Sequence, residues 1–174
     1  MHQQYNSGMF WGVQDEQGED HMIQPADVQQ LIAKWWFAYD SALFDEWPEM
    51  WTDAAHFSCR TDTGTTNYEE FVSADVRGRD AVLAWQTDHR LASPHPLRHG
   101  GENVHILNVT DARADYRSYI RVSQIVNGSP SPLSTAIVHG AVAVEDGVLK
   151  IADLNVVLDT EDSTPLGEKQ AATS

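Results

Sequence analysis

The second half of the chain holds four long runs of alternating, β-branched residues, and these runs constrain the fold more than any other feature. The runs are VHILNV, ADYRSYIRVSQIV, STAIVHGAVAV and LKIADLNVVLD, between residues 104 and 159. Alternation with a period of two is typical of strands that bury one face. The segments TDAR, NGSPSP and EDG separate the runs and carry turn signals. The sequence therefore predicts four strands that form an antiparallel sheet.

The first half of the chain is mainly helical. Apolar residues recur at helical spacing over 25–44, and Pro25 suits the first turn of that helix. A short helix at about 46–53, a strand at 54–60 and a helix over 78–91 follow. Three helices followed mainly by strands are typical of an α+β domain, with helices packed on a strongly curved, mostly antiparallel sheet. Such an arrangement leaves a pocket between the first helix and the sheet.

One domain with two polar ends accounts for the whole chain. Residues 23–160 contain all the periodic segments, and we expect them to form the domain. Residues 1–22 predict an N-terminal arm that packs on the body, packs on a neighbouring subunit, or stays loose. Residues 161–174 have the polar composition of a poorly ordered C-terminal tail.

The charge of the chain limits its partners. Its 174 residues include 26 acidic and 11 basic side chains, which gives a net charge of -15. This charge repels polyphosphate, so we expect neither nucleic acid nor an anionic membrane as a partner. No apolar stretch approaches the roughly 20 residues that span a bilayer, and the N-terminus lacks the features of a signal peptide. The charge balance favours a small neutral or apolar molecule as the ligand. A single cysteine permits no internal disulfide, so we expect a cytoplasmic protein.

Five short motifs occur in the order found in one known superfamily. They are YDSALFDEWPEMWTDAAHF, GRDAVLAW, RHGGEN, SYIRV and DGVLKIADLNVV. With these motifs the chain resembles the SnoaL-like, NTF2-like superfamily, which includes scytalone dehydratase, ketosteroid isomerase, polyketide cyclases, bile-acid dehydratases and the small subunits of ring-hydroxylating dioxygenases. The resemblance runs from about Ile23 to Leu158 and implies an NTF2-like cone. It also implies a homo-oligomer, a dimer or trimer, that associates through the outer face of the sheet.

Asp40 is the first candidate catalytic residue. It lies in WWFAYDSALF, where Trp36, Phe37 and Phe44 are helical neighbours. A carboxylate among aromatic side chains is desolvated, which favours its protonated form and suits a proton carrier. The alternative is a buried aspartate bonded to a nearby arginine, or one that faces solvent at the helix end. The resemblance places Asp40 and Tyr39 in the active site, whereas periodicity alone makes Tyr39 an equally good core residue.

His99 is the second candidate catalytic residue. The resemblance implies that a histidine at the entrance of this strand pairs with the helix carboxylate across the cavity. It also matches Asn103 to the family pattern H-x-x-x-N, in which the asparagine orients a substrate oxygen. An Asp40–His99 pair could abstract a proton beside a carbonyl or expel hydroxide. The alternatives are a loop histidine bonded to backbone and an asparagine that caps the loop.

Other side chains are candidates for binding the substrate. In ADYRSYIRVSQIV, alternation places Tyr116 and Ser118 on the face directed at the pocket and the arginines on the opposite face. Trp36, His139 and Asn155 complete the predicted substrate-binding set. The alternative for His139 is a core or interface residue.

The glycines and histidines around His99 also admit other interpretations. A phosphate-binding loop needs glycines between a strand and a helix N-terminus, whereas Gly100 and Gly101 precede a strand and no lysine follows. The nearby histidines lack the close H-x-H pair and the glutamate in register that a cupin-like metal site requires. We therefore expect neither a metal nor a cofactor. The glycines are interpreted as residues that let the chain bend into the strand.

These patterns and the resemblance together predict a cofactor-free lyase or isomerase, dehydratase-like or cyclase-like. It would use the Asp40–His99 pair on a hydrophobic polycyclic or polyketide-like molecule. The alternative is a non-catalytic ligand-binding protein, or a structural protein like a dioxygenase small subunit. Alignment with scytalone dehydratase places that enzyme's second catalytic histidine near Ser118 and its water-positioning tyrosine near Cys59. This chain therefore lacks both of those side chains. Scytalone itself is therefore not the expected substrate.

Overall fold

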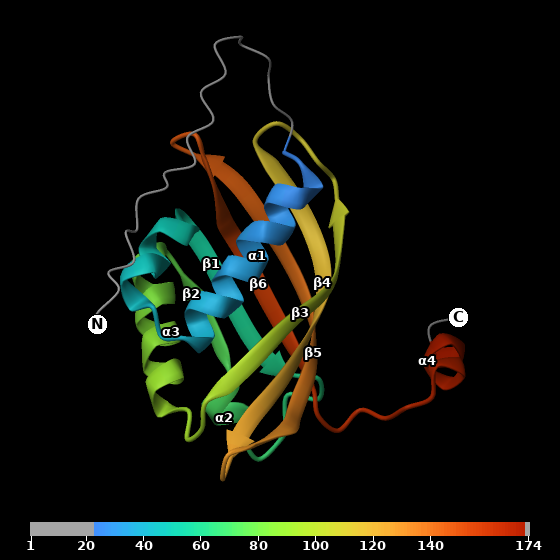
Figure 1. Cartoon of the computed structure of the whole chain (residues 1–174). Coiled ribbons are helices and arrows are strands. Elements are labelled where there is room, and N and C mark those ends of the chain that lie inside the picture. The colour runs from blue at the N-terminus through green and yellow to red at the C-terminus, as the bar shows by residue number, and fades with distance from the viewer. Residues whose placement is uncertain (1–22, 173–174) are drawn as a thin grey trace, which may run out of the picture.

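The computed structural model describes residues 23–172, in which a long helix crosses the concave face of a six-stranded sheet (Figure 1). The elements in chain order are α1 (Pro25–Asp40), the 3-10 helix η1 (Phe44–Met50), β1 (Trp51–Thr61), α2 (Glu69–Val72), β2 (Ala74–Arg77), α3 (Arg79–Ala92), β3 (Leu97–Leu107), β4 (Arg113–Val126), β5 (Ser129–Glu145), β6 (Val148–Asp159) and α4 (Leu166–Ala172). The N-terminal arm expected over residues 1–22 lies outside the described residues.

The sheet has the strand order β2-β1-β6-β5-β4-β3. Neighbouring strands are antiparallel except for β1 and β6, which run parallel. The predicted α+β class, with helices on a mostly antiparallel sheet, is confirmed. The helix α1 packs against β3, an edge strand, and a hydrogen bond between Asp40 and the His99 backbone N–H joins the end of the helix to the start of the strand.

A left-handed residue ends α1 at Asp40, four residues before the predicted end. Ala42 has a φ of 52°, the Leu43 N–H donates to the Ala38 carbonyl at 2.9 Å, and the Ala42 N–H donates to the Tyr39 carbonyl at 3.1 Å. This bonding pattern is a Schellman motif, which usually has glycine at the left-handed position. The apolar pattern continues past Asp40 and alanine favours helix, so the sequence carried no signal for this end. The motif leaves Asp40 as the last helical residue.

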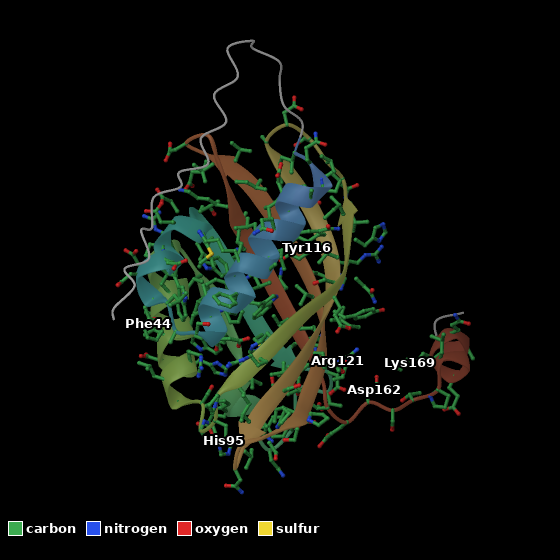
Figure 2. The ribbon with its side chains drawn as sticks, viewed as in Figure 1. Phe44, His95, Tyr116, Arg121, Asp162 and Lys169 are labelled. Atoms are coloured by element: carbon green, nitrogen blue, oxygen red, sulfur yellow. The ribbon has the colours of Figure 1, made fainter. Side chains whose placement is uncertain are left out.

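Tryptophans fill the space between α1 and the sheet. Trp35, Trp47 and Trp51 are fully buried, and the ring of Trp35 lies 5.3 Å from that of Trp47 and 5.0 Å from that of Trp51. Tyr116 of β4 is equally buried and lies where α1 crosses the sheet (Figure 2). Aromatic rings of this size bury a large apolar area, so this cluster is the centre of the core.

Several element boundaries differ from those predicted. The strand β3 begins at Leu97, so Gly100 and Gly101 lie within it and do not precede it. The loop-rich insertion before α3 contains the short elements α2 and β2. The C-terminal tail contains the exposed helix α4, where Lys169 pairs with Asp162 away from the sheet (Figure 2). Short elements of this kind lack the repeated apolar spacing that sequence patterns detect.

Candidate functional site

The end of α1 and the start of β3 bring Asp40 and His99 together. Asp40 Oδ1 lies 2.6 Å from His99 Nδ1, and Asp40 Oδ2 accepts a hydrogen bond from the His99 backbone N–H at 2.6 Å. The two side chains are 7% and 11% exposed, respectively. Because an ionised carboxylate only accepts hydrogen bonds, His99 Nδ1 is the donor in this bond, and Nε2 is the ring nitrogen left to exchange a proton with a ligand. No residue within 23–172 bonds to Nε2.

Aromatic side chains fix the orientation of the His99 ring. Trp36 stacks on it, with ring centroids 4.8 Å apart and ring planes within 10° of each other. Tyr39 meets the same ring edge-on, at a centroid distance of 5.4 Å. Gly101 permits this packing, because a Cβ at that position would lie 3.1 Å from the Trp36 ring. Gly101 of RHGGEN therefore allows the Trp36 ring to approach the strand closely. It does not mark a bend before the strand.

A pocket of about 520 Å³ opens beside the pair, between α1 and β3. Its lining residues are Ala33, Trp36, Phe37, Asp40, Ser41, Arg98, His99 and Gly101. Of the predicted site residues, Asp40, His99 and Trp36 line this pocket. Phe37 and Arg98 were not predicted, although Phe37 is next to Trp36 in sequence and Arg98 is next to His99. The volume falls in the range of small-molecule sites.

The hydroxyl of Tyr39 is directed at a histidine that the sequence did not single out as a site residue. Tyr39 Oη lies 2.8 Å from His89 Nδ1, and the His89 ring stacks on Trp85 of the same helix. Burial lowers the pKa of His89 to about 4, with smaller contributions from the charges of His99 and Arg90. Burial raises the pKa of Tyr39. The phenol therefore donates to a neutral imidazole. The spacing of His89 from buried Val82 and Gln86 on α3 could have indicated its inward position.

Acid should destabilise the protein through His89. In the unfolded chain a histidine has a pKa of about 6.5, so between about pH 6.5 and pH 4 the unfolded state binds more protons than the folded state. Stability therefore falls as the pH is lowered through this window, by up to about 3 kcal/mol from this group. Urea unfolding of the wild type and of His89→Gln at pH 7 and pH 4.5 measures the effect. The variant, which can still accept the Tyr39 hydrogen bond, should lose about 2 kcal/mol less. Equal losses in both proteins would contradict this assignment.

Tyr116 and Ser118 point to the inner side of the sheet, as predicted. Both are buried, and Tyr116 Oη and Ser118 Oγ have no hydrogen-bond partner among the described residues. Burial also raises the pKa of Tyr116. Neither residue lines the pocket beside His99. They belong to the interior of the cone, behind that pocket.

Asn103, His139 and Asn155 do not line the pocket of Asp40 and His99, so the structure does not bring them together with the pair. A β-bulge between Glu102 and His105 adds a residue to β3 and turns Asn103, with a φ of 53°, to the outer face. His139 pairs in register with Asn155 on the outer face, and Ser58 bonds to the Asn155 amide oxygen. A bulge reverses the alternation of side chains, and a sequence pattern does not reveal it.

The geometry also decides against one alternative for Asp40, that of an aspartate bonded to a nearby arginine. Arg90 donates to the backbone carbonyls of Tyr39 and Asp40, at 3.1 and 2.8 Å, and does not contact the Asp40 carboxylate. Burial raises the pKa of Cys59 to about 12, so this thiol is not a nucleophile near neutral pH. Among residues 23–172, no group of three or more His, Cys, Asp or Glu side chains could hold a metal ion.

Residues 21–155 match the model of the SnoaL-like domain family. The match covers most of the chain, so the protein belongs to the SnoaL-like family. None of the helices within 23–172 is both long and apolar enough to cross a membrane. Comparison with curated proteins found no match.

Solved structures share the fold at low sequence identity. A Catenulispora acidiphila protein in complex with S-DNPA is 19% identical, with 86% of this chain and 96% of that chain covered and a TM-score of 0.62. ActVI-ORFA from Streptomyces coelicolor is 17% identical, with 77% and 96% covered and a TM-score of 0.61. A β subunit assigned to an aromatic-ring-hydroxylating dioxygenase of Novosphingobium aromaticivorans is 15% identical, with 81% and 92% covered and a TM-score of 0.63. These similarities establish the NTF2-like fold and carry no activity by themselves.

Proposed function

We propose that the protein is a cofactor-free lyase or isomerase in which His99 removes a proton from a carbon next to a carbonyl group. The observation that carries the proposal is the hydrogen-bonded Asp40–His99 pair at the wall of a pocket, in which Nε2 of His99 has no hydrogen-bond partner among residues 23–172. An oriented imidazole with a free nitrogen is the usual arrangement of a general base. The SnoaL-like family includes enzymes such as polyketide cyclases, which supports the same class.

The proton transfer needs only residues of this chain. His99 Nε2 takes the proton, and the electrons of the carbon–hydrogen bond move toward the carbonyl oxygen. The resulting imidazolium is stabilised by the Asp40 carboxylate at Nδ1 and by the face of the Trp36 ring. His99 then returns the proton to another substrate atom, which is an isomerisation, or to a departing hydroxide, which is a dehydration. Asp40 is thus the partner that orients His99, and His99 is the proton carrier.

The pocket suits a flat, apolar substrate. Trp36 and Phe37 of α1 supply aromatic surface, and a volume of about 520 Å³ accepts a compound of a few fused rings. Arg98, on the same wall, supplies donors for an oxygen that becomes negative during the transfer. A hydrophobic polycyclic or polyketide-like ketone has the matching properties.

Deuterium exchange tests the proposed function. We expect the wild type in D2O to accelerate exchange of the hydrogens next to the carbonyl in at least one member of a panel of one-ring to three-ring ketones, followed by proton NMR. His99→Gln should lower the acceleration by about 10²-fold to 10⁴-fold because glutamine cannot take up the proton. His56→Gln is the matched control, since His56 also bonds to an aspartate, Asp153, but lies on the outer face. A ketone that binds in the pocket without exchange would favour the ligand-binding alternative and overturn the acid–base mechanism.

A further inference from the structure

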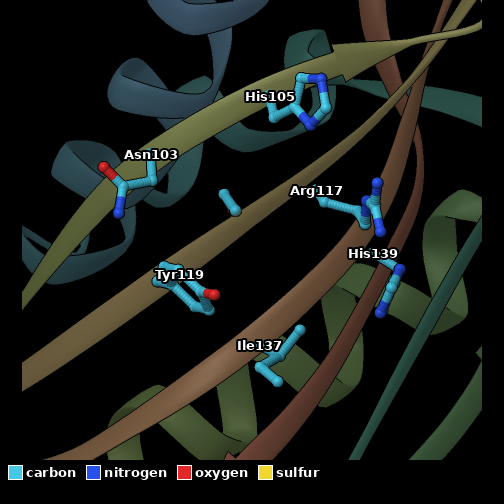
Figure 3. Close-up of a pocket in the computed structure, with 7 residues that line it drawn as sticks. Asn103, His105, Arg117, Tyr119, Ile137 and His139 are labelled. Atoms are coloured by element: carbon cyan, nitrogen blue, oxygen red, sulfur yellow. The ribbon is translucent and has the colours of Figure 1, made fainter.

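A second hollow, of about 440 Å³, lies on the outer face of the sheet, opposite α1. Its lining residues are Asn103, His105, Arg117, Ser118, Tyr119, Ile137 and His139. The six that Figure 3 labels form two rows that cross β3, β4 and β5. One row consists of His105, Arg117 and His139, and the other consists of Asn103, Tyr119 and Ile137. The first row is basic, and the second is largely apolar.

The basic row is fixed by strand register. His105 is paired with Arg117, and Arg117 is paired with His139, so the three residues are direct cross-strand neighbours on one face. Side chains at such positions lie close together. The guanidinium of Arg117 therefore lies between two imidazole rings, each of which can donate a hydrogen bond to an anion.

No acidic side chain of residues 23–172 pairs with Arg117. Two other arginines of β4 with the same outward direction are both paired: Arg113 with Asp115 and Asp153, and Arg121 with Glu102. The protein has 26 acidic residues and a net charge of -15, so acidic partners are abundant. Arg117 is thus an exposed arginine that has no acidic partner within residues 23–172 and lies between two histidines.

The second row gives the hollow an apolar wall with one polar end. Tyr119 is 52% exposed and Ile137 is 39% exposed, which leaves both available to a ligand. The bulge in β3 turns Asn103 into the same hollow, where its amide adds a donor and an acceptor. Bulges frequently redirect a side chain at a binding site.

We propose that this hollow binds a small organic acid, with the carboxylate on Arg117 between His105 and His139 and the apolar body on Tyr119 and Ile137. The planar guanidinium of arginine matches a carboxylate with two parallel hydrogen bonds. The site is on the opposite side of the sheet from the pocket of His99. It is therefore separate from the proposed catalytic function and does not depend on it.

Titration with benzoate, monitored by NMR of the histidine side chains, tests this site. Saturable shifts are expected at His105 and His139 and not at His99. Benzamide, which is neutral and of the same shape, should bind about tenfold more weakly or worse, and so should inorganic phosphate, which lacks the apolar body. Arg117→Gln should weaken benzoate binding about tenfold or more, because it removes a charge-assisted bond. Arg121→Gln is the matched control on the same strand and face, and should change the affinity by less than about twofold.

Four results would overturn the binding site itself. They are no saturable benzoate binding, equal binding of benzamide, an unchanged affinity in Arg117→Gln, and shifts confined to His99. Equal binding of inorganic phosphate would overturn the organic acid as the ligand class. Dissociation of an oligomer by Arg117→Gln, with no benzoate binding by the wild type, would assign the row to a contact between copies of the chain. Because Arg117 is exposed, the variant should fold, and His139→Gln gives a second variant that should also weaken binding.

Discussion

Replacing Asp40 by asparagine is expected to lower the catalysed exchange by about 10²-fold to 10⁴-fold, the usual contribution of a positioned general base. An asparagine amide can donate to His99 Nδ1, which would move the imidazole proton to Nε2. The nitrogen that faces the substrate would then hold a hydrogen and could not accept another. The measurement is the exchange rate of the ketone that responds to the wild type, under the same conditions. The fold should persist, because the amide fills the space of the carboxylate.

The Asp40→Asn/His99→Gln double variant separates an orienting role from an independent one. If Asp40 acts only through His99, the double variant should be no slower than His99→Gln, within about threefold. If the rate loss of the double variant equals the product of the losses of the two single variants, Asp40 exchanges protons with the substrate itself, as the sequence alone had suggested. Asp153→Asn removes the partner of His56 on the outer face and should leave the rate unchanged.

Gly140→Ala is expected to lower the free energy of unfolding by about 3 kcal/mol or more. Gly140 of β5 is the cross-strand partner of Tyr116, whose ring lies over the glycine. A Cβ at residue 140 would lie 2.3 Å from Cζ and 2.4 Å from Cε1 of that ring. The ring is fully buried at the centre of the core, where close packing resists its displacement. Urea unfolding of the wild type and the variant gives the difference.

A second substitution shows whether the Tyr116 ring is the cause. In Tyr116→Ala, the obstructing atoms are gone, so Gly140→Ala should cost far less in that background than in the wild type. The difference between the two costs is the coupling energy of the pair. A Gly140→Ala variant that loses less than about 1 kcal/mol in the wild-type background would mean that Tyr116 rearranges easily.

Much of the fold could be predicted because it depends on local patterns. The alternation in ADYRSYIRVSQIV correctly assigned Tyr116 and Ser118 to the inner face, and the apolar spacing located α1. The end of α1 could not be predicted, because Ala42 adopts a left-handed conformation that favours glycine or asparagine. The bulge that turns Asn103 outward was hidden for a similar reason, since one extra residue in a strand leaves no compositional trace.

The candidate site was predictable to a lesser degree. Asp40 and His99 are 59 residues apart, and no spacing rule connects them, so their pairing came from the family resemblance. Trp36 was found by its place in the aromatic run. The bond between Tyr39 and His89 spans 50 residues and depends on how α3 packs against α1, which only the tertiary structure determines.

The single bulge in β3 also bears on how such a protein can diversify. On one side of the bulge, the strand presents His99 and Gly101 to the pocket beneath α1, and on the other side it presents His105 to the outer hollow. Substitutions at residues 99 and 101 therefore act on the pocket beneath α1, whereas substitutions at residues 103 and 105 act on the outer hollow. An edge strand built in this way allows two recognition surfaces to change independently, although fewer than ten residues of the same segment serve both.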